Sequence, residues 1–310
     1  MIKAFIKKVG TGPSGHRDLS HDEAREAASL LLSGHSTAAQ TGALLLGLRL
    51  KGETGPEMSG FLAALRAIIR HRPMGKAASD HYPDLDVGDP YDGRSRSPSF
   101  TVPGAILAGR AGLRISLHGL SDVPVKMGPG VLDAWKESGH TEGFSGETDN
   151  VVCLSQETIA PELATLLPIR QELGLRTLWN TVEKAVNPLT SPAQIIGIFH
   201  EPIIAKLHSA LMAQTHAPKR ILFIAGVEGS TDLHPHRETV CHLFDRDISP
   251  EITRHLIPSG KDVTARPPEE HAVRRQAALF LFAGGRYPDF DTALTSLERT
   301  PLPSPSRSPR

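Results

Sequence analysis

The sequence predicts an α/β protein, with a small N-terminal helical bundle domain and a larger α/β domain whose central, mostly parallel sheet is flanked by helices. Three consecutive helix starts in the first 72 residues predict the bundle. Strand-length apolar runs alternate with helical patterns after residue 100, and strands separated by helices are typical of a parallel sheet. A hydrophobic content of 39% supports packed cores in both parts.

Each of the three helix starts carries a capping box, in which a hydroxyl accepts from the third helical amide and a Glu or Gln returns to the first. The boxes are Ser20 with Glu23, Thr37 with Gln40, and Thr54 with Glu57. Apolar residues at helical spacing follow each box. We therefore expect a helical domain over residues 1–72, and part of 160–185 is a candidate to pack onto it.

Residues 73–299 are predicted to form the α/β domain. A segment rich in Pro, Gly, Asp, Ser and Arg leads into it at 72–101. Strand signals lie at 113–117, 151–154, 195–199 and 221–225, and helical patterns at 102–111, 202–215, 271–283 and 290–298. The tail, 300–310, is rich in Pro, Ser and Arg and is predicted to be disordered.

Composition excludes several classes of protein. Lys+Arg 34 equals Asp+Glu 34, which excludes a chain that is basic overall but leaves room for a local basic patch. Two cysteines exclude a disulfide framework and favour a reducing compartment, so we expect a cytoplasmic protein. No apolar run approaches the ~20 residues that a membrane span needs, and no membrane partner is expected.

Two loops are candidates to bind phosphate. The stretch 85–100 offers turn residues and two guanidinium groups, a chemistry that suits phosphate oxygens. Its candidate residues are Gly88, Asp92, Gly93, Arg94 and Arg96. An exposed basic loop is an equally good interpretation of this composition. His118, Gly119 and Lys126 follow the next strand, and ligands of open α/β sheets bind at such strand ends. An isolated histidine is more often structural.

Two carboxylates are candidates to hold Mg²⁺. Glu228 and Asp232 follow the strand at 221–225, and hard oxygen ligands there suit Mg²⁺ with a phosphorylated substrate. A zinc site is a weaker alternative, because the spacing of its candidate ligands matches no standard pattern. These ligands are His234, His236, Cys241 and His242.

A glycine-rich stretch near the N-terminus is better explained by a loop than by a cofactor. Residues 10–15 match G-x-G-x-x-G, but a dinucleotide site needs a buried strand before it and a helix starting within it. The preceding residues carry three lysines, and the next helix starts only at Ser20. We therefore interpret the stretch as a loop between two helices.

Taken in chain order, three segments resemble the anthranilate phosphoribosyltransferase family: Leu19–Arg66, Leu167–His200 and Gln276–Gly285. The resemblance extends over residues 18–298. It implies a helical domain joined to an α/β domain, with phosphoribosyl pyrophosphate and Mg²⁺ in the cleft between them. It also implies a homodimer through the helical domain, where small residues would allow close helix approach. These residues are Ala27, Ala28, Ala43 and Gly47.

The chain departs from the family at its phosphate cradle. The family loop reads Val-Gly-Thr-Gly-Gly-Asp-Gly, whereas Val87–Gly93 contains Pro90, which has no amide hydrogen to offer phosphate. The family's Lys-His-Gly-Asn-Arg becomes Leu117–Ser121 without either cation, and only Asp232 matches the family's Asp-Glu metal pair. Arg170 matches the arginine that the family uses at the aromatic acceptor. Arg176 and Asn180 are also retained.

We therefore expect a glycosyltransferase-family protein, similar to anthranilate phosphoribosyltransferases, that binds a phosphorylated or anionic ligand but does not make phosphoribosyl-anthranilate. The sequence leaves open whether it is an enzyme. The alternative on the same fold is a non-enzymatic nucleic-acid-binding protein, supported by the Arg94–Arg96 loop and the basic tail. A third alternative is a small-molecule sensor or structural partner.

Overall fold

The computed structural model describes residues 1–12, 14–70, 83–88, 98–120, 130–145, 148–260 and 267–303. The chain forms two compact units. The first comprises Met1–Arg72, Gln156–Pro188 and Pro202–Ala217, and the second comprises Pro73–Ser155, Leu189–Glu201 and Pro218–Arg310. The helix expected at 202–215 therefore belongs to the helical unit, whereas the sequence analysis assigned it to the α/β domain.

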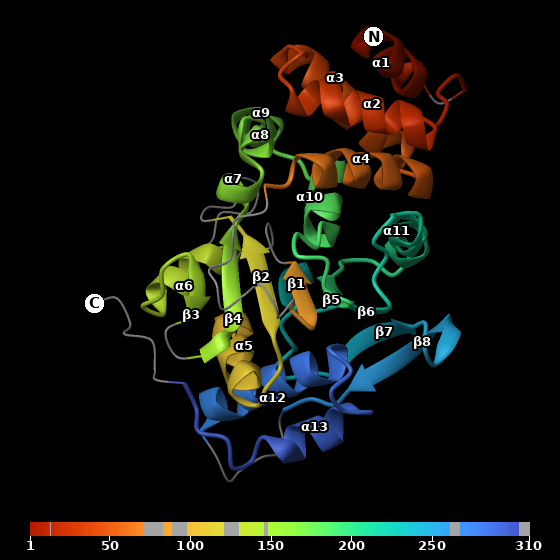
Figure 1. The fold of residues 1–310 in the computed structure, drawn as a ribbon. Helices are drawn as coiled ribbons and strands as arrows, with labels where there is room; N and C mark the ends of the chain where they lie inside the picture. Colours follow the sequence, from red (N-terminus) through yellow and green to blue (C-terminus); the bar gives the residue numbers. More distant parts are fainter. Residues whose placement is uncertain are drawn as a thin grey trace. The chain divides into compact units, whose positions relative to one another are not determined.

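The first unit is a helical bundle (Figure 1). Its elements are α1 (Ile2–Gly10), α2 (His21–Leu32), α3 (Ala38–Lys51), α4 (Gly55–Ile68), α7 (Gln156–Ile159), α8 (Pro161–Ala164), α9 (Leu167–Leu173), α10 (Leu178–Val182), the short 3-10 helix η1 (Glu183–Ala185) and α11 (Ile203–Met212). Among these, α2 packs against α4, and α1 packs against α3. Because α1 is a helix and not a strand, the dinucleotide interpretation of residues 10–15 is wrong.

The three predicted capping boxes are confirmed. Ser20 Oγ accepts from Glu23 N at 3.2 Å, and the Glu23 carboxylate accepts from Ser20 N at 2.7 Å. The same reciprocal pair begins α3 at Thr37 and α4 at Thr54. Local hydrogen bonds between residues three apart therefore mark where each of these helices begins.

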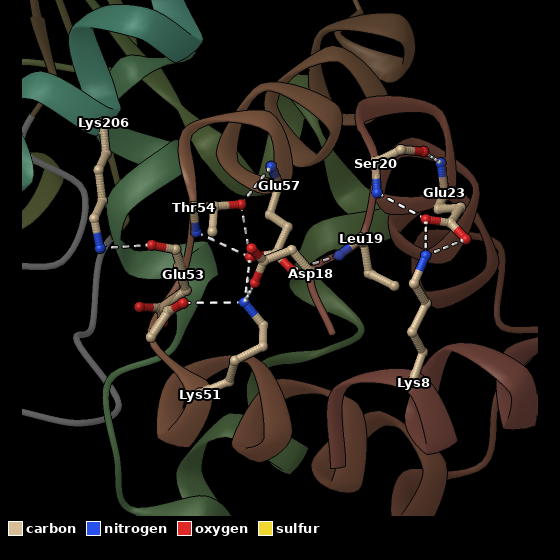
Figure 2. A network of polar contacts seen from close by, with 11 residues as sticks. Lys8, Asp18, Leu19, Ser20, Glu23, Lys51, Glu53, Thr54, Glu57 and Lys206 are labelled. Atoms are coloured by element: carbon tan, nitrogen blue, oxygen red, sulfur yellow. Dashed lines mark hydrogen bonds and ion pairs between the residues drawn. The ribbon is translucent and has the colours of Figure 1, made fainter. Parts of the chain in front are cut away.

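A polar network connects the starts of α2 and α4 with the end of α3 (Figure 2). The fully buried Glu57 carboxylate accepts from Leu19 N at 2.9 Å, from Thr54 N at 2.9 Å and from Lys51 Nζ at 2.8 Å. Burial lowers the pKa of the Lys51 ammonium, but its hydrogen bonds to Asp18 and Glu57 outweigh burial and hold that pKa above its ordinary value. The network thus compensates a charge that would be costly to bury alone.

The second unit contains an eight-stranded sheet within the described residues, in the order β3-β4-β2-β1-β5-β6-β7-β8 (Figure 1). The strands are β1 (Leu85–Gly88), β2 (Ile115–Gly119), β3 (Gly143–Ser145), β4 (Thr148–Ser155), β5 (Ala193–Gly197), β6 (Arg220–Ile224), β7 (Thr239–Asp245) and β8 (Ser249–Ile257). The central strands from β4 to β6 pair in parallel, while β3, β7 and β8 join antiparallel. The predicted mostly parallel sheet is confirmed, although no strand was predicted at β1, β3, β7 or β8.

Helices and one face of the sheet share the hydrophobic core of the second unit. The helices are α5 (Thr101–Arg110), α6 (Val131–Glu137), α12 (Pro268–Ala283) and α13 (Phe290–Ser296). Alternate residues of the strands, such as Leu85 and Val87 of β1, belong to this core. Because successive side chains of a strand point to opposite faces, Asp86 lies on the other face. None of the helices in the described ranges is long and apolar enough to span a membrane.

Candidate functional site

The carboxyl ends of β1 and β2 bring three of the predicted site residues together. The two strands are adjacent and parallel, and Gly88 pairs with His118 in their register. Gly119 is the last residue of β2. Ligands of open α/β sheets bind at this end of the strands. The remaining predicted residues of these two segments lie outside the described residues: Asp92, Gly93, Arg94, Arg96 and Lys126.

A row of buried polar side chains crosses the middle of the sheet beside Gly88. Asp86 of β1 pairs in register with Ser116 of β2 and with Gln194 of β5. Asp86 Oδ1 accepts from Ser116 Oγ at 2.9 Å, and Asp86 Oδ2 accepts from Gln194 Nε2 at 3.1 Å and from His118 Nε2 at 3.3 Å. All four side chains are fully buried. This face of the sheet is therefore polar where the opposite face is hydrophobic.

The buried Asp232 carboxylate holds the start of α5. Its Oδ1 accepts from the amide of Phe100 at 2.8 Å, and its Oδ2 accepts from the hydroxyls of Ser99 and Thr101, each at 3.0 Å. The first amides of a helix need such acceptors, and the N-cap residue Phe100 supplies no side-chain cap. The predicted metal ligand therefore has a structural task that the sequence analysis did not foresee.

The other predicted metal ligand, Glu228, lies in the short 3-10 helix η2 (Val227–Gly229) with a φ of 55°, a conformation that is unusual for a residue other than glycine. Within the described ranges, no three His, Cys, Asp or Glu side chains gather closely enough to hold a metal ion. Both oxygens of Asp232 already accept hydrogen bonds, so Mg²⁺ would compete with these donors for the lone pairs of the carboxylate.

The zinc alternative is wrong. Cys241 lies in β7 with its side chain fully buried in the hydrophobic core, and burial raises the pKa of its thiol to about 12. A zinc ligand must be a thiolate, which this environment disfavours. His242 follows Cys241 directly on the strand and therefore points to the opposite face, where its Nε2 lies 3.5 Å from Glu201 Oε1.

Arg170 lies in the helical unit, in α9, and forms a buried ion pair. Its Nη1 donates to Glu183 Oε1, and its Nη2 donates to Glu183 Oε2 at 3.3 Å. Both side chains are 0% exposed. The retained Asn180 is also used within the unit, because its Oδ1 accepts from Thr177 N at 2.8 Å in the capping box of α10.

Sequence reasoning missed four residues that shape these sites: Asp86, Ser116, Gln194 and Glu183. The first three are polar residues within short buried strands, where an alternation of polar and apolar residues was the available signal. For Glu183 the available signal was the difference between this sequence and the corresponding family segment. The family segment similar to residues 170–183 reads Arg-Arg-Glu-Leu-Gly-Ile-Arg-Thr-Val-Phe-Asn-Leu-Leu-Gly, so a glycine stands at the position of Glu183.

Two family models match the chain. One describes the helical bundle domain of a glycosyl transferase family and matches residues 3–68, and the other describes the α/β domain of a glycosyl transferase family and matches residues 143–278. Together with the helical unit and the mostly parallel sheet, these matches define the class of the protein, a two-domain member of a glycosyl transferase family.

Relatives of known sequence identify the family. An uncharacterized protein of Aquifex aeolicus is 32% identical over 249 residues, which cover 80% of this chain and 75% of the relative. The anthranilate phosphoribosyltransferase of Halorubrum lacusprofundi is 30% identical over 289 residues, which cover 88% of this chain and 75% of the relative. The chain belongs to the glycosyl transferase family of the anthranilate phosphoribosyltransferases, which confirms the resemblance at the level of the family.

Solved structures share the fold. The anthranilate phosphoribosyltransferase of Thermus thermophilus matches with a TM-score of 0.70 at 20% identity, over 94% of this chain and 93% of that one. The enzyme of Saccharomyces cerevisiae, in complex with PRPP and Mg, matches with a TM-score of 0.74 at 13% identity, over 96% and 93% of the two chains. At these identities the comparison establishes the fold alone.

Proposed function

We propose that the chain binds a small phosphorylated or anionic ligand at the carboxyl ends of β1 and β2. The parallel pairing of Gly88 with His118 carries this proposal, because it starts the two following segments at the same edge of the sheet. In the sequence these segments contain Arg94, Arg96 and Lys126. Their side chains supply the donors and the positive charge that phosphate requires. The related yeast enzyme binds a phosphorylated ligand, PRPP.

We further propose that the chain does not act as an anthranilate phosphoribosyltransferase. Pro90 offers no amide hydrogen where the family loop has a glycine. Arg170, which matches the family's arginine at the aromatic acceptor, donates through both terminal nitrogens to Glu183. The Glu183 carboxylate therefore already occupies the guanidinium that would otherwise bind the carboxylate of an acidic acceptor. Transfer to a different acceptor is the form of catalysis that these two observations leave open.

Magnesium is a further part of the proposal. When bound, Mg²⁺ would neutralise the oxygens of a phosphorylated ligand, with Glu228 and Asp232 as its protein ligands. Asp232 would then have to give up hydrogen bonds to residues 99–101. Binding of the phosphorylated ligand is therefore measured both with and without Mg²⁺.

Titration calorimetry tests the proposed site. Inorganic pyrophosphate and ribose 5-phosphate are titrated into the intact protein, the double variant R94A/R96A and the control Arg254→Ala, whose arginine lies on the edge strand β8. Each lost charge-assisted hydrogen bond is worth about 1.5–3 kcal/mol, so we expect the double variant to bind at least about tenfold more weakly. Unchanged affinity in R94A/R96A contradicts the site.

An activity assay tests the second part of the proposal. The protein is incubated with PRPP, anthranilate and Mg²⁺, and the reaction is monitored through the loss of anthranilate fluorescence. We expect no useful formation of phosphoribosyl-anthranilate. Robust turnover overturns this expectation.

Nucleic acid is the alternative partner, on the strength of Arg94, Arg96 and the basic residues of 300–310. Its affinity would fall steeply with salt, since each neutralised phosphate releases counterions. Tight, salt-dependent binding of an oligonucleotide without any binding of pyrophosphate or ribose 5-phosphate favours this alternative.

An unchanged melting temperature with all of these ligands favours a sensor or structural role.

We also propose that two chains pair through the helical unit. Of the four small residues that suggested this contact, three are used inside the unit, because Ala27 and Ala28 are fully buried and Gly47 lies against Val9 of α1, whereas Ala43 is exposed. The surface of α3 offers a different candidate contact in the exposed side chains of Leu46 and Leu50.

A further inference from the structure

We propose that Phe199 is a stacking platform for a planar ring, and that the phosphorylated ligand is a nucleotide whose base lies on this side chain. The inference rests on the proposed function, because it names the part of the ligand that is not phosphate. Phe199 is a contacting residue in this arrangement, and it determines which class of phosphorylated compound binds.

Phe199 follows a strand at which the order of the parallel sheet reverses. From β1 the chain continues to β2 and then to β4 on one side, whereas β5 and β6 lie on the other side of β1. Open α/β sheets bind ligands in the crevice outside the carboxyl ends of the strands at such a switch point. Gly88 of β1 pairs in register with Ile196 of β5, so the residues that follow these two strands begin side by side.

The side chain of Phe199 is exposed at this edge of the sheet. It is 43% exposed, although the preceding Ile198 is buried and its amide donates to the carbonyl oxygen of Ile224 at 2.8 Å. Single exposed apolar residues are ordinary on protein surfaces. Within the described ranges, however, Phe199 is the one aromatic residue among the large exposed hydrophobic side chains. An aromatic ring offers a face on which another planar ring can stack, and an aliphatic side chain does not.

The loop after β6 holds the ring of Phe199 in place. A Cβ atom at Gly229 would overlap Cε2, Cζ and Cδ2 of Phe199, so the edge of the ring lies directly against this glycine. Gly229 has a φ of 78° and Glu228 a φ of 55°, values that glycine adopts readily and other residues rarely. The loop therefore has a backbone conformation that suits glycine at the point of contact. A ring that is already oriented loses little conformational entropy when a ligand binds.

One molecule of modest size can reach both the ring and the proposed phosphate donors. Strand β5 lies next to β1, neighbouring strands are about 4.8 Å apart, and Arg94 and Arg96 follow β1 in the sequence. A nucleoside monophosphate carries phosphate at one end of its sugar and a planar base at the other. Any base can stack on an aromatic side chain, because every base has a π face. A nucleotide thus uses both features at once.

Titration calorimetry with three probes tests the platform. AMP carries both a base and a phosphate, ribose 5-phosphate lacks the base, and adenosine lacks the phosphate. Stacking of a base on an aromatic side chain strengthens binding about fivefold or more. We therefore expect AMP to bind at least about fivefold more tightly than ribose 5-phosphate. In Phe199→Ala we expect AMP to bind no more tightly than ribose 5-phosphate, whose own affinity should not change.

Two further variants separate stacking from a general loss of apolar surface. Phe199→Trp supplies another π face and should retain the affinity for AMP. Leu256→Ala removes a 48% exposed side chain from the edge strand β8 of the same unit and should change the affinity for neither compound. Because Phe199 is exposed, its replacement should leave the melting temperature nearly unchanged. Equal weakening of AMP binding in Phe199→Ala and Leu256→Ala overturns the proposal.

Fluorescence provides a direct signature of stacking. Trp135 and Trp179 are 0% exposed, so a base that stacks on the indole introduced by Phe199→Trp quenches that indole and not the two native ones. We expect AMP and adenosine to quench the emission of this variant, and ribose 5-phosphate not to quench it. Binding of AMP to the variant without quenching overturns the proposal.

The outcomes distinguish this inference from the proposed function. If AMP and ribose 5-phosphate bind equally well to the unaltered protein and to Phe199→Ala, the inference is wrong and the phosphate site stands. If adenosine binds to the unaltered protein but not to Phe199→Ala, while ribose 5-phosphate binds to neither, the platform is supported and the phosphate site is contradicted. If none of the three probes binds, both proposals are wrong.

Discussion

Arg170 and Glu183 neutralise each other inside the helical unit, and this contact has a measurable consequence. Removing one partner of a buried ion pair leaves the other charge uncompensated, which destabilises a protein by about 3–5 kcal/mol. We expect Arg170→Ala to lower the free energy of unfolding by about this amount. The double variant R170M/E183L, which removes both charges and keeps the volume, should recover most of the loss. Chemical denaturation of the three proteins measures both effects.

An exposed ion pair of the same unit provides the control. Arg70 Nη2 lies 2.6 Å from Glu162 Oε1, but the Arg70 side chain is 61% exposed. Such pairs contribute at most about 1 kcal/mol, so Arg70→Ala should have a small effect. If Arg170→Ala costs no more than Arg70→Ala, or if it abolishes ligand binding without loss of stability, then Arg170 is a ligand-binding residue and not an internal ion-pair partner.

At the scale of the elements, the close approach of α2 and α4 depends on Gly60. A Cβ atom at this position would lie 2.4 Å from the carbonyl oxygen of His21 and 2.7 Å from Ala24 Cβ. Alanine gains up to about 1 kcal/mol of helix propensity over glycine, but overpacking against a backbone oxygen costs about 1–3 kcal/mol. We therefore expect Gly60→Ala to lower the melting temperature.

The matched control is Gly42→Ala in α3. There a new Cβ would meet only Leu173 Cδ2, at 3.5 Å, which is an ordinary contact. Only the higher helix propensity of alanine then affects stability, and we expect this variant to be more stable than the unaltered protein by up to about 1 kcal/mol. Equal effects of the two substitutions would show that helix spacing does not depend on Gly60. Thermal unfolding followed by circular dichroism measures both variants.

The elements that the sequence predicted are those whose signals are local. The capping boxes at Ser20, Thr37 and Thr54 need only residues three apart, and all three were found. Strand β8 was missed because its residues are mostly exposed and include Pro250, so no apolar run marks it. The polar row was missed for a different reason. Asp86 and Gln194 are 108 residues apart in the chain, and only the register of β1 with β5 brings them together.

At the scale of the whole molecule, tertiary contacts determine which segments of the chain make up the helical unit. Gln156–Pro188 and Pro202–Ala217 return to it from later in the chain. Contacts over such distances include the hydrogen bond from Lys206 Nζ to the carbonyl oxygen of Glu53, at 2.8 Å. A pass along the sequence identifies the helix at 202–215 but contains no local signal for which unit it joins.

The proposed pairing of two chains also belongs to this scale. Leu46 and Leu50 lie one turn apart on α3 and are 36% and 78% exposed. A third exposed leucine, Leu175 at 43%, precedes Arg176, whose carbonyl oxygen accepts a hydrogen bond from Arg49 of α3. We expect light scattering to give the mass of a dimer, and Leu50→Glu to shift it toward the monomer, because a buried carboxylate opposes association. Ile248→Glu, on a similarly exposed residue of the other unit, should leave the mass unchanged. A monomer at high concentration, or equal loss of the dimer in both variants, would show that α3 is not the contact.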